Sequence, residues 1–175
     1  VTALKVRGSF DDCQALVRSL LAHPALQKRY RVTTANSINV GRLLPQMVYY
    51  LHAWLRLPDP SRPLVVAVPS GNYGNLTAGL LANFMGMPVE RFIAAGNVNR
   101  VFPDYLETGE YKPRPSVETL ASAMDVGNPS NTERIFSLFS RDHPAITARI
   151  HGFSINTDRD IRRAMHELYR LCGYR

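Results

Sequence analysis

The stretch that decides the fold reads Val65-Val66-Ala67-Val68-Pro69-Ser70-Gly71-Asn72-Tyr73-Gly74-Asn75. Its first four residues, together with Leu64, are apolar and mostly β-branched, which is typical of a strand covered on both faces. The residues after them are rich in glycine and asparagine and predict a tight turn. The sequence therefore predicts a buried strand, a turn and the start of a helix in direct succession.

This succession would build a cradle for a phosphate group. Gly71 and Gly74 let the backbone turn sharply and come close to a ligand. The helix expected from about Asn75 offers unpaired N–H groups and the positive end of its dipole, so a phosphate there needs no basic side chain. The turn matches neither a Walker A loop nor the G-x-G-x-x-G pattern. A second interpretation stays open, in which asparagine simply suits left-handed backbone angles in a tight turn.

Strands and helices alternate on both sides of this stretch. We expect strands at residues 2–7, 30–35, 64–68, 90–95 and 149–155. We expect helices capped by Ser9, over 44–55, over 75–85, after Asn131 and after Thr157, with 98–118 irregular apart from one turn near Pro103. The alternation predicts a single α/β domain over residues 1–175, built on a parallel, doubly wound sheet flanked by helices.

Two polar connections follow expected strands. Residues 36–39 come after the strand at 30–35, and residues 70–75 come after the strand at 64–68. Ligands of parallel sheets bind beyond the carboxyl ends of the strands, so both connections face one cleft if these strands are neighbours. Asn39 and Arg42 are then candidate cleft residues, because arginine binds phosphate or carboxylate with two hydrogen bonds. A surface ion pair is the alternative for Arg42.

Composition bounds the class of protein. Of the 175 residues 45% are apolar, which is ample for a core. No run of 18 apolar residues occurs and the N-terminus lacks a signal-peptide core, so we expect no membrane partner. The two cysteines form no C-x-x-C pair and the five histidines no H-x-x-x-H pair, so we expect no metal site. Two thiols far apart suit a reducing cytoplasm.

The net charge is +7, and arginines contribute most of it. They are spread along the chain, and only Arg162 and Arg163 are adjacent. A nucleic-acid surface usually concentrates its charge and interleaves aromatic residues. The pattern therefore favours a solvated arginine-rich surface, and we expect no nucleic-acid partner.

Four motifs, taken together and in order, closely resemble threonine synthase of the bacterial and fungal type over nearly the full chain. They are Gly8-Ser9-Phe10-Asp11-Asp12-Cys13-Gln14, Asn36-Ser37-Ile38-Asn39 with Arg42 and Gln46, Pro69-Ser70-Gly71-Asn72-Tyr73-Gly74-Asn75, and Ala123-Met124-Asp125-Val126-Gly127-Asn128-Pro129-Ser130-Asn131. The resemblance implies a pyridoxal-phosphate enzyme with the tryptophan-synthase-β fold, which is that of fold-type-II enzymes. It also implies a lyase of threonine biosynthesis that converts O-phosphohomoserine and water to threonine and phosphate.

The resemblance also implies site residues. Five residues match the family's loop around the cofactor phosphate: Gly71, Asn72, Tyr73, Gly74 and Asn75. Tyr73 stands where phenylalanine is commoner, Gly96 and Arg100 where threonine and aspartate are commoner, and Ala121 where serine is usual. For Asp125 and the pair Ser130-Asn131 we favour a role in ordering the loop before a helix.

Pyridoxal-phosphate chemistry requires a lysine that binds the cofactor covalently. The family's lysine lies in a Phe-Lys-Asp motif that would precede this chain. The chain's own lysines, Lys5, Lys28 and Lys112, lack those surroundings and are expected at the surface. We therefore expect an internal, inactive fragment of a larger enzyme, without the lysine-bearing N-terminal part or the C-terminal part. Its apolar surface would then contact the missing segments or a second copy.

Two other hypotheses remain. The chain could be a self-standing α/β domain that binds a phosphorylated metabolite or a nucleotide without chemistry. A nucleic-acid binder is the third, and it predicts a steep loss of affinity with salt.

Overall fold

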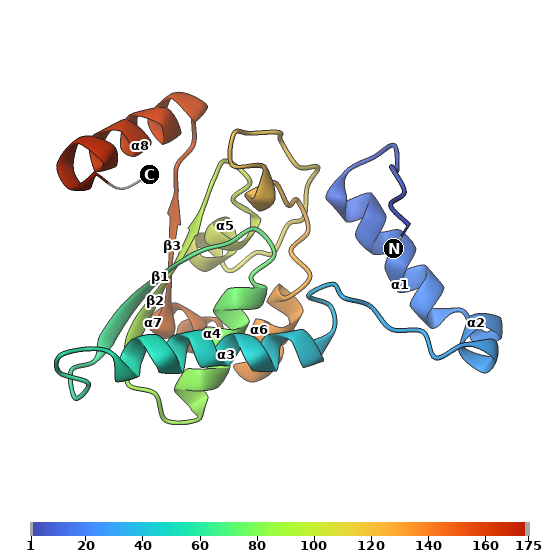
Figure 1. The fold of residues 1–175 in the computed structure, drawn as a ribbon, viewed down its shortest axis with the longest axis horizontal. Helices are drawn as coiled ribbons and strands as arrows, with labels where there is room; N and C mark the ends of the chain where they lie inside the picture. The colour runs from blue at the N-terminus through green and yellow to red at the C-terminus, as the bar shows by residue number, and fades with distance from the viewer. Residues whose placement is uncertain (1, 174–175) are drawn as a thin grey trace.

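The structure is a computed structural model, and it describes residues 2–173 (Figure 1). Three strands and a set of helices follow one another in the order α1 (Phe10–Ala22), α2 (Pro24–Arg29), α3 (Val40–Leu55), β1 (Leu64–Pro69), α4 (Gly74–Phe84), β2 (Val89–Gly96), α5 (Val101–Thr108), the 3-10 helix η1 (Ser122–Met124), α6 (Thr132–Leu138), α7 (His143–Arg149), β3 (Ile150–Ser154) and α8 (Asp158–Cys172).

The three strands form one parallel sheet in the order β1-β2-β3. Val66 pairs with Phe92, and Phe92 pairs in turn with Ile150. Because the strands are parallel, their carboxyl ends meet at one edge of the sheet, where residues 70–75 follow β1. The predicted α/β class with a parallel sheet and flanking helices is confirmed, as are the strands expected at 64–68, 90–95 and 149–155.

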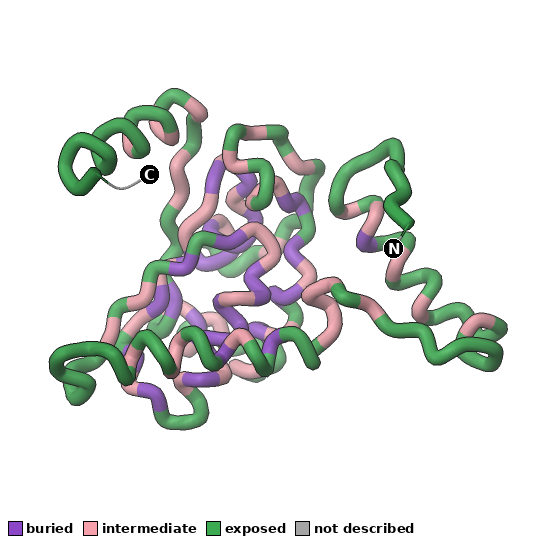
Figure 2. Tube along the Cα trace, viewed as in Figure 1, coloured by how far each residue is buried: buried purple, intermediate pink, exposed green. Residues whose placement is uncertain are grey.

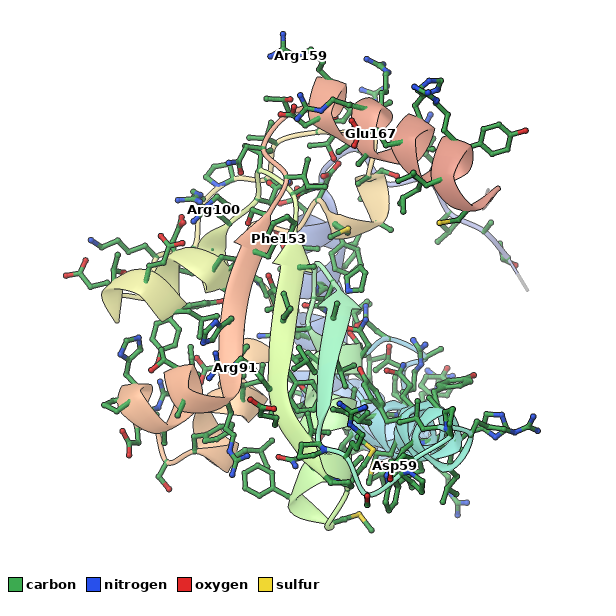
Figure 3. All side chains as sticks on the ribbon, turned by 90° about the vertical axis from the view of Figure 1, so that its left-hand side faces the viewer. Asp59, Arg91, Arg100, Phe153, Arg159 and Glu167 are labelled. Carbon is green, nitrogen blue, oxygen red and sulfur yellow. The ribbon has the colours of Figure 1, made fainter. Side chains whose placement is uncertain are left out.

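Helices cover one face of this sheet. Val68, Phe92 and Ile150 point toward α4, α5, α6 and α7 and belong to a single apolar core. The opposite face is open: Val65 is 57% exposed and Phe153 is 54% exposed. Figure 3 labels Phe153 near the end of β3. The expectation that the strand at 64–68 is covered on both faces is therefore wrong for this chain, because no described helix packs on the face that carries Val65.

Two of the expected strands are absent. Residues 2–7 and 30–35 have no regular structure, because the described sheet has three strands and neither segment pairs with any of them. Strand formation needs a neighbouring strand for its backbone hydrogen bonds, and local sequence cannot supply one. Helix α2 was not predicted, and α5 is two turns long rather than one turn near Pro103.

The helix starts predicted at Ser9 and Thr157 are confirmed. Ser9 and Asp12 form a reciprocal capping box at the start of α1, and the Thr157 side chain accepts a hydrogen bond from the Asp160 N–H at the start of α8. Helix α8 nevertheless has no buried residue, and it extends from the body of the molecule (Figures 1 and 2). Within residues 2–173, no helix combines the length and apolar character needed to cross a membrane.

Gly79 sets the distance between α4, α3 and the sheet. A Cβ on this residue would lie 2.8 Å from both the Phe92 ring and the Tyr50 ring. In an open helix, glycine to alanine stabilises by about 1 kcal/mol. Here we expect G79A to lower the free energy of unfolding by about 1–2 kcal/mol, because two packed rings must move. Urea denaturation measures it, with G96A as the control, since a Cβ there meets no atom closer than 3.8 Å. A gain in stability in G79A would contradict this packing.

Candidate functional site

The turn after β1 is held by hydrogen bonds among its own residues. The Ser70 hydroxyl accepts a hydrogen bond from the Tyr73 N–H at 2.9 Å and donates to Asn75 Oδ1 at 2.5 Å. Asn75 Nδ2 donates to the Pro69 carbonyl at 2.9 Å, and Asn75 Oδ1 also accepts from the Leu76 N–H at 3.0 Å. Ser70 and Asn75 thus close the turn from residue 69 to the first residues of α4.

Tyr73 gives the turn its shape. Its backbone is left-handed, with φ 55° and ψ 20°, at the N-cap position of α4. A residue with a bulky side chain adopts this conformation only at a cost in free energy, which its packing must offset. The Tyr73 ring offsets part of this cost, because it is buried and packs on Phe102 with ring centroids 4.7 Å apart. Burial also raises the pKa of the Tyr73 hydroxyl above its ordinary value, so the group stays protonated.

Four backbone N–H groups of the turn have no acceptor among residues 2–173. Those of Tyr73 and Leu76 are satisfied by side chains, as described above, but none of the described residues accepts a hydrogen bond from the N–H of Gly71, Asn72, Gly74 or Asn75. Gly74 is buried, and protein interiors seldom leave such donors without a partner. Free N–H donors at a helix start are suited to bind an anion.

Gly71 lies directly against the chain segment that precedes α6. A Cβ at this position would lie 2.8 Å from Met124 Cα and 2.9 Å from Val126 Cγ2. Gly74 is less crowded, and the nearest atom, Ser37 Cβ, would be 3.3 Å from a Cβ there. Close backbone approach therefore requires glycine at 71 in particular.

The structure places Asn39 and Arg42 at the start of α3, after a segment that is not a strand. Asn39 caps this helix: its Oδ1 accepts from the Gly41 N–H at 3.0 Å, and its Nδ2 donates to the Thr34 carbonyl at 3.1 Å. Arg42 donates to the Ala35 carbonyl. It is exposed, and none of the ion pairs within residues 2–173 involves it.

Arg42 and the turn share a cavity of about 510 Å³. Its lining runs along α3 and reaches Asn75. Tyr50, which also lines it, donates its hydroxyl to the Asn75 carbonyl at 2.7 Å. Burial raises the pKa of Tyr50 to about 12, so the hydroxyl remains a donor at neutral pH. The arrangement brings one cation to the side of the turn that carries Asn75.

The side chain of Asn72 binds residues whose part in the site was not predicted. Asn72 Nδ2 donates to Ser37 Oγ at 2.7 Å, and its Oδ1 accepts from the Ser130 N–H at 2.5 Å and the Ser130 hydroxyl at 2.9 Å. Asn131 Nδ2 donates to the Asn72 carbonyl at 3.1 Å. Ser37, Ser130 and Asn131 were visible in the sequence as motif residues, but only the fold brings them to the turn.

Asp125 holds the segment behind the turn. One carboxylate oxygen accepts from Asn97 Nδ2 at 2.7 Å, from the Thr119 hydroxyl at 2.8 Å and from Asn99 Nδ2 at 3.1 Å. The other accepts from the Thr119 N–H at 2.8 Å. These bonds tie the segment to the loop after β2, which supports the loop-ordering interpretation of Asp125.

Two residues of this region, Arg100 and Gly96, differ from the family's commoner choices, aspartate and threonine. Arg100 forms ion pairs with Asp104 at 2.9 Å and with Glu107 at 2.6 Å. Gly96 lies beside the Tyr73 hydroxyl, which would be 3.8 Å from a Cβ at position 96.

Among residues 2–173, no group of three or more His, Cys, Asp or Glu side chains could hold a metal ion.

Comparison with known proteins finds relatives of this chain. The chain is 43% identical over 175 residues to the threonine synthase of Escherichia coli, with 99% of the chain covered, and 43% identical over 170 residues to that of Serratia marcescens, with 96% covered. The chain is homologous to part of threonine synthase. It spans about 40% of the length of these relatives. No family model matches it.

Solved threonine synthases share the fold. The crystal structure of the Escherichia coli enzyme superposes with a TM-score of 0.89 at 41% identity, covering 98% of this chain and 40% of that one. The pyridoxal-phosphate-bound threonine synthase of Brucella melitensis superposes with a TM-score of 0.83 at 31% identity, covering 99% of this chain and 42% of that one. The resemblance drawn from the four motifs is thereby confirmed.

Proposed function

We propose that residues 71–75 hold the phosphate group of pyridoxal 5′-phosphate in a threonine synthase. The observation that carries the proposal is the set of four backbone N–H groups without acceptors, on Gly71, Asn72, Gly74 and Asn75. A doubly charged phosphate offers acceptors to all of them, and the start of α4 adds a favourable dipole. Tyr73 contributes the left-handed backbone at the N-cap of α4, between the two pairs of donors.

The parent activity we propose is the conversion of O-phosphohomoserine and water to threonine and phosphate. Pyridoxal phosphate supplies an electron sink for carbanion chemistry when bound. This chain's own part is to bind and orient: the turn neutralises the cofactor phosphate, and Arg42 offers a guanidinium in the same cavity for an anionic group of the phosphorylated amino acid. Asn39 would assist by fixing the start of the helix that carries Arg42.

We propose further that the chain is one part of a longer polypeptide, with the covalently binding lysine on another part. Lys5, Lys28 and Lys112 are all exposed, and none lines either cavity beside the turn. Parallel sheets are normally covered on both faces, whereas the face carrying Val65 and Phe153 is open. Remaining segments of the same protein would cover it, and the isolated chain would tend to self-associate through it.

A cytoplasmic location belongs to the same proposal. Cys13 and Cys172 are both free, which suits a reducing compartment.

The test is a titration of the chain with pyridoxal 5′-phosphate, followed by fluorescence and by absorbance. We expect weak, reversible binding that inorganic phosphate competes away, because the N–H groups recognise the phosphate alone. Pyridoxal without its phosphate is the matched control and should bind at least about ten-fold more weakly. We expect no absorbance band of lysine-bound cofactor and no conversion of O-phosphohomoserine.

Three outcomes would contradict the proposal. Equal affinity for pyridoxal and pyridoxal 5′-phosphate would show that the turn at residues 71–75 is not the binding site. A cofactor band that disappears on mutation of a lysine of this chain would contradict the placement of the lysine elsewhere. Tight nucleotide binding without affinity for pyridoxal 5′-phosphate would favour a self-standing metabolite-binding domain.

A further inference from the structure

Asn131 is a completely buried polar side chain beside the turn. It is 0% exposed and stands immediately before α6. Its Nδ2 group donates to the Asn72 carbonyl at 3.1 Å and to Ser37 Oγ at 3.3 Å. One side chain thus links three segments that are far apart in sequence.

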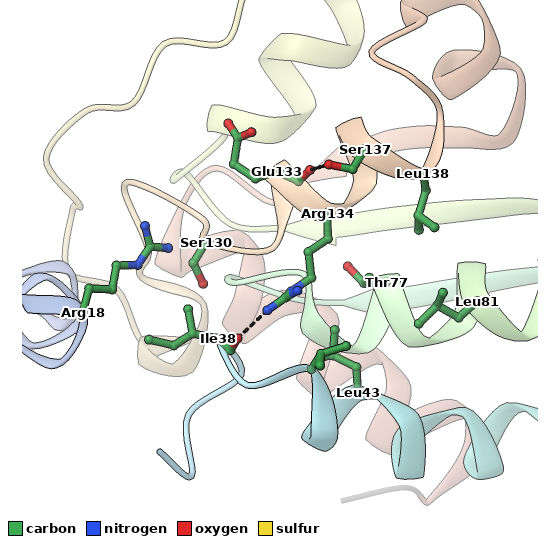
Figure 4. A pocket seen from close by; sticks show the side chains of 11 residues that line it. Arg18, Ile38, Leu43, Thr77, Leu81, Ser130, Glu133, Arg134, Ser137 and Leu138 are labelled. Atoms are coloured by element: carbon green, nitrogen blue, oxygen red, sulfur yellow. Dashed lines mark hydrogen bonds between the residues drawn. The ribbon is translucent and has the colours of Figure 1, made fainter. Parts of the chain in front are cut away.

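The orientation of this amide is set by Arg134. The guanidinium Nε donates to Asn131 Oδ1 at 3.1 Å, and because arginine cannot accept, the oxygen of the amide must face it. Arg134 also donates to the Ile38 carbonyl, as Figure 4 shows, beside a cavity of about 570 Å³. The Nδ2 donors are therefore directed at the turn and at residue 37.

The contact with Asn72 acts on the backbone of the candidate site. The Asn72 carbonyl belongs to the peptide unit whose N–H is that of Tyr73, so a bond to this carbonyl fixes the plane between two of the free donors, those of Asn72 and Gly74. The Asn72 side chain is held separately by Ser130 and Ser37. Backbone and side chain of residue 72 are anchored to the start of α6 by different atoms.

We propose that Asn131 is a positioning residue for the phosphate cradle, acting through the Asn72 peptide rather than by touching the ligand. The inference rests on the proposed phosphate-binding function of residues 71–75. It assigns to Asn131 more than ordering of the loop: without its Nδ2 group the free N–H groups of the turn lose their fixed direction, and affinity for a phosphate falls.

The test uses Asn131→Asp, which keeps the shape of the side chain but replaces the donor with a carboxylate oxygen. Asn83→Asp is the matched control, because Asn83 Nδ2 also donates to two main-chain carbonyls, those of Met87 and Val89, at the far end of α4. Both substitutions should lower the melting temperature. We expect N131D alone to weaken pyridoxal 5′-phosphate and inorganic phosphate binding about ten-fold or more.

A second readout needs no ligand. Amide hydrogen exchange at Tyr73, whose N–H donates to the Ser70 hydroxyl from the peptide unit that Asn131 holds, should be about ten-fold faster in N131D than in N83D. Arg134→Met removes the guanidinium that orients the Asn131 amide and should weaken phosphate binding by a smaller factor, roughly two- to five-fold. It carries the test if N131D does not fold.

The outcomes separate the two proposals. If the unmodified chain binds phosphate but N131D behaves as N83D does in both affinity and exchange, Asn131 is only structural and the inference is wrong. If the unmodified chain does not bind phosphate, the proposed function fails, while faster exchange of the Tyr73 amide in N131D would still support the positioning role.

Discussion

Replacing Gly71 with alanine is expected to weaken pyridoxal 5′-phosphate binding by at least about ten-fold. The reason is steric and lies behind the turn rather than in front of it. The new Cβ would lie 2.8 Å from Met124 Cα and 3.0 Å from the Met124 carbonyl carbon. Backbone atoms cannot rotate away as a side chain can, so residue 71 must move and its N–H loses its direction. Fluorescence titration of G71A against the unmodified chain measures the loss.

The control for this experiment is Gly96→Ala at the same edge of the sheet. A Cβ there would be 3.8 Å from the Tyr73 hydroxyl and 3.9 Å from the Phe153 carbonyl, which are ordinary contacts. G96A should bind within about two-fold of the unmodified chain. If G71A bound as well as G96A, close approach of the backbone at residue 71 would not be required for the site.

Removal of the Asp125 carboxylate should cause the largest loss of stability, about 3 kcal/mol or more in D125A. Four hydrogen bonds end on this group, from Asn97, Asn99 and both the N–H and the hydroxyl of Thr119. Asn97 is 2% exposed, so water cannot readily replace the bond that its Nδ2 group loses, although this group keeps the Thr119 hydroxyl at 2.9 Å. Urea denaturation followed by circular dichroism gives the change in free energy of unfolding.

Asp59→Ala is the matched control. The Asp59 carboxylate accepts two hydrogen bonds, from the N–H and the hydroxyl of Ser61, in an exposed loop. Its loss should cost less than about 1 kcal/mol, because water replaces the partner. Comparable losses in D125A and D59A would show that the loop before α6 is not held to the loop after β2 as the structure indicates.

The candidate site shows where sequence reasoning reached its limit. Residues 70–75 were identified because strand, glycine turn and helix start are consecutive, so their chemistry is local. Ser130 and Asn131 follow Asn72 in the sequence by 58 and 59 residues. Their own neighbourhood predicts only a loop before a helix, and nothing in it indicates that the partner is the turn.

Proline-containing segments were misjudged for a related reason. Residues 98–118 were expected to be irregular apart from one turn near Pro103, yet α5 runs from Val101 to Thr108 and contains Pro103 in its first turn. Proline is tolerated there because the N–H groups of the first turn have no partner within the helix. The helix forms since Phe102, Tyr105 and Leu106 are buried against the core.

By itself the sequence determined the elements whose signals are local. These are the apolar runs of β1 and β2, the buried pattern of α4, the caps at Ser9 and Thr157, and the turn at 70–75. Only the tertiary structure decided that residues 2–7 and 30–35 are not strands, that one face of the sheet is open, and that Asn131 meets Asn72. These three features depend on which distant segments of the chain come together. Local propensity does not determine strand pairing, the coverage of a sheet face or a hydrogen bond across 59 residues.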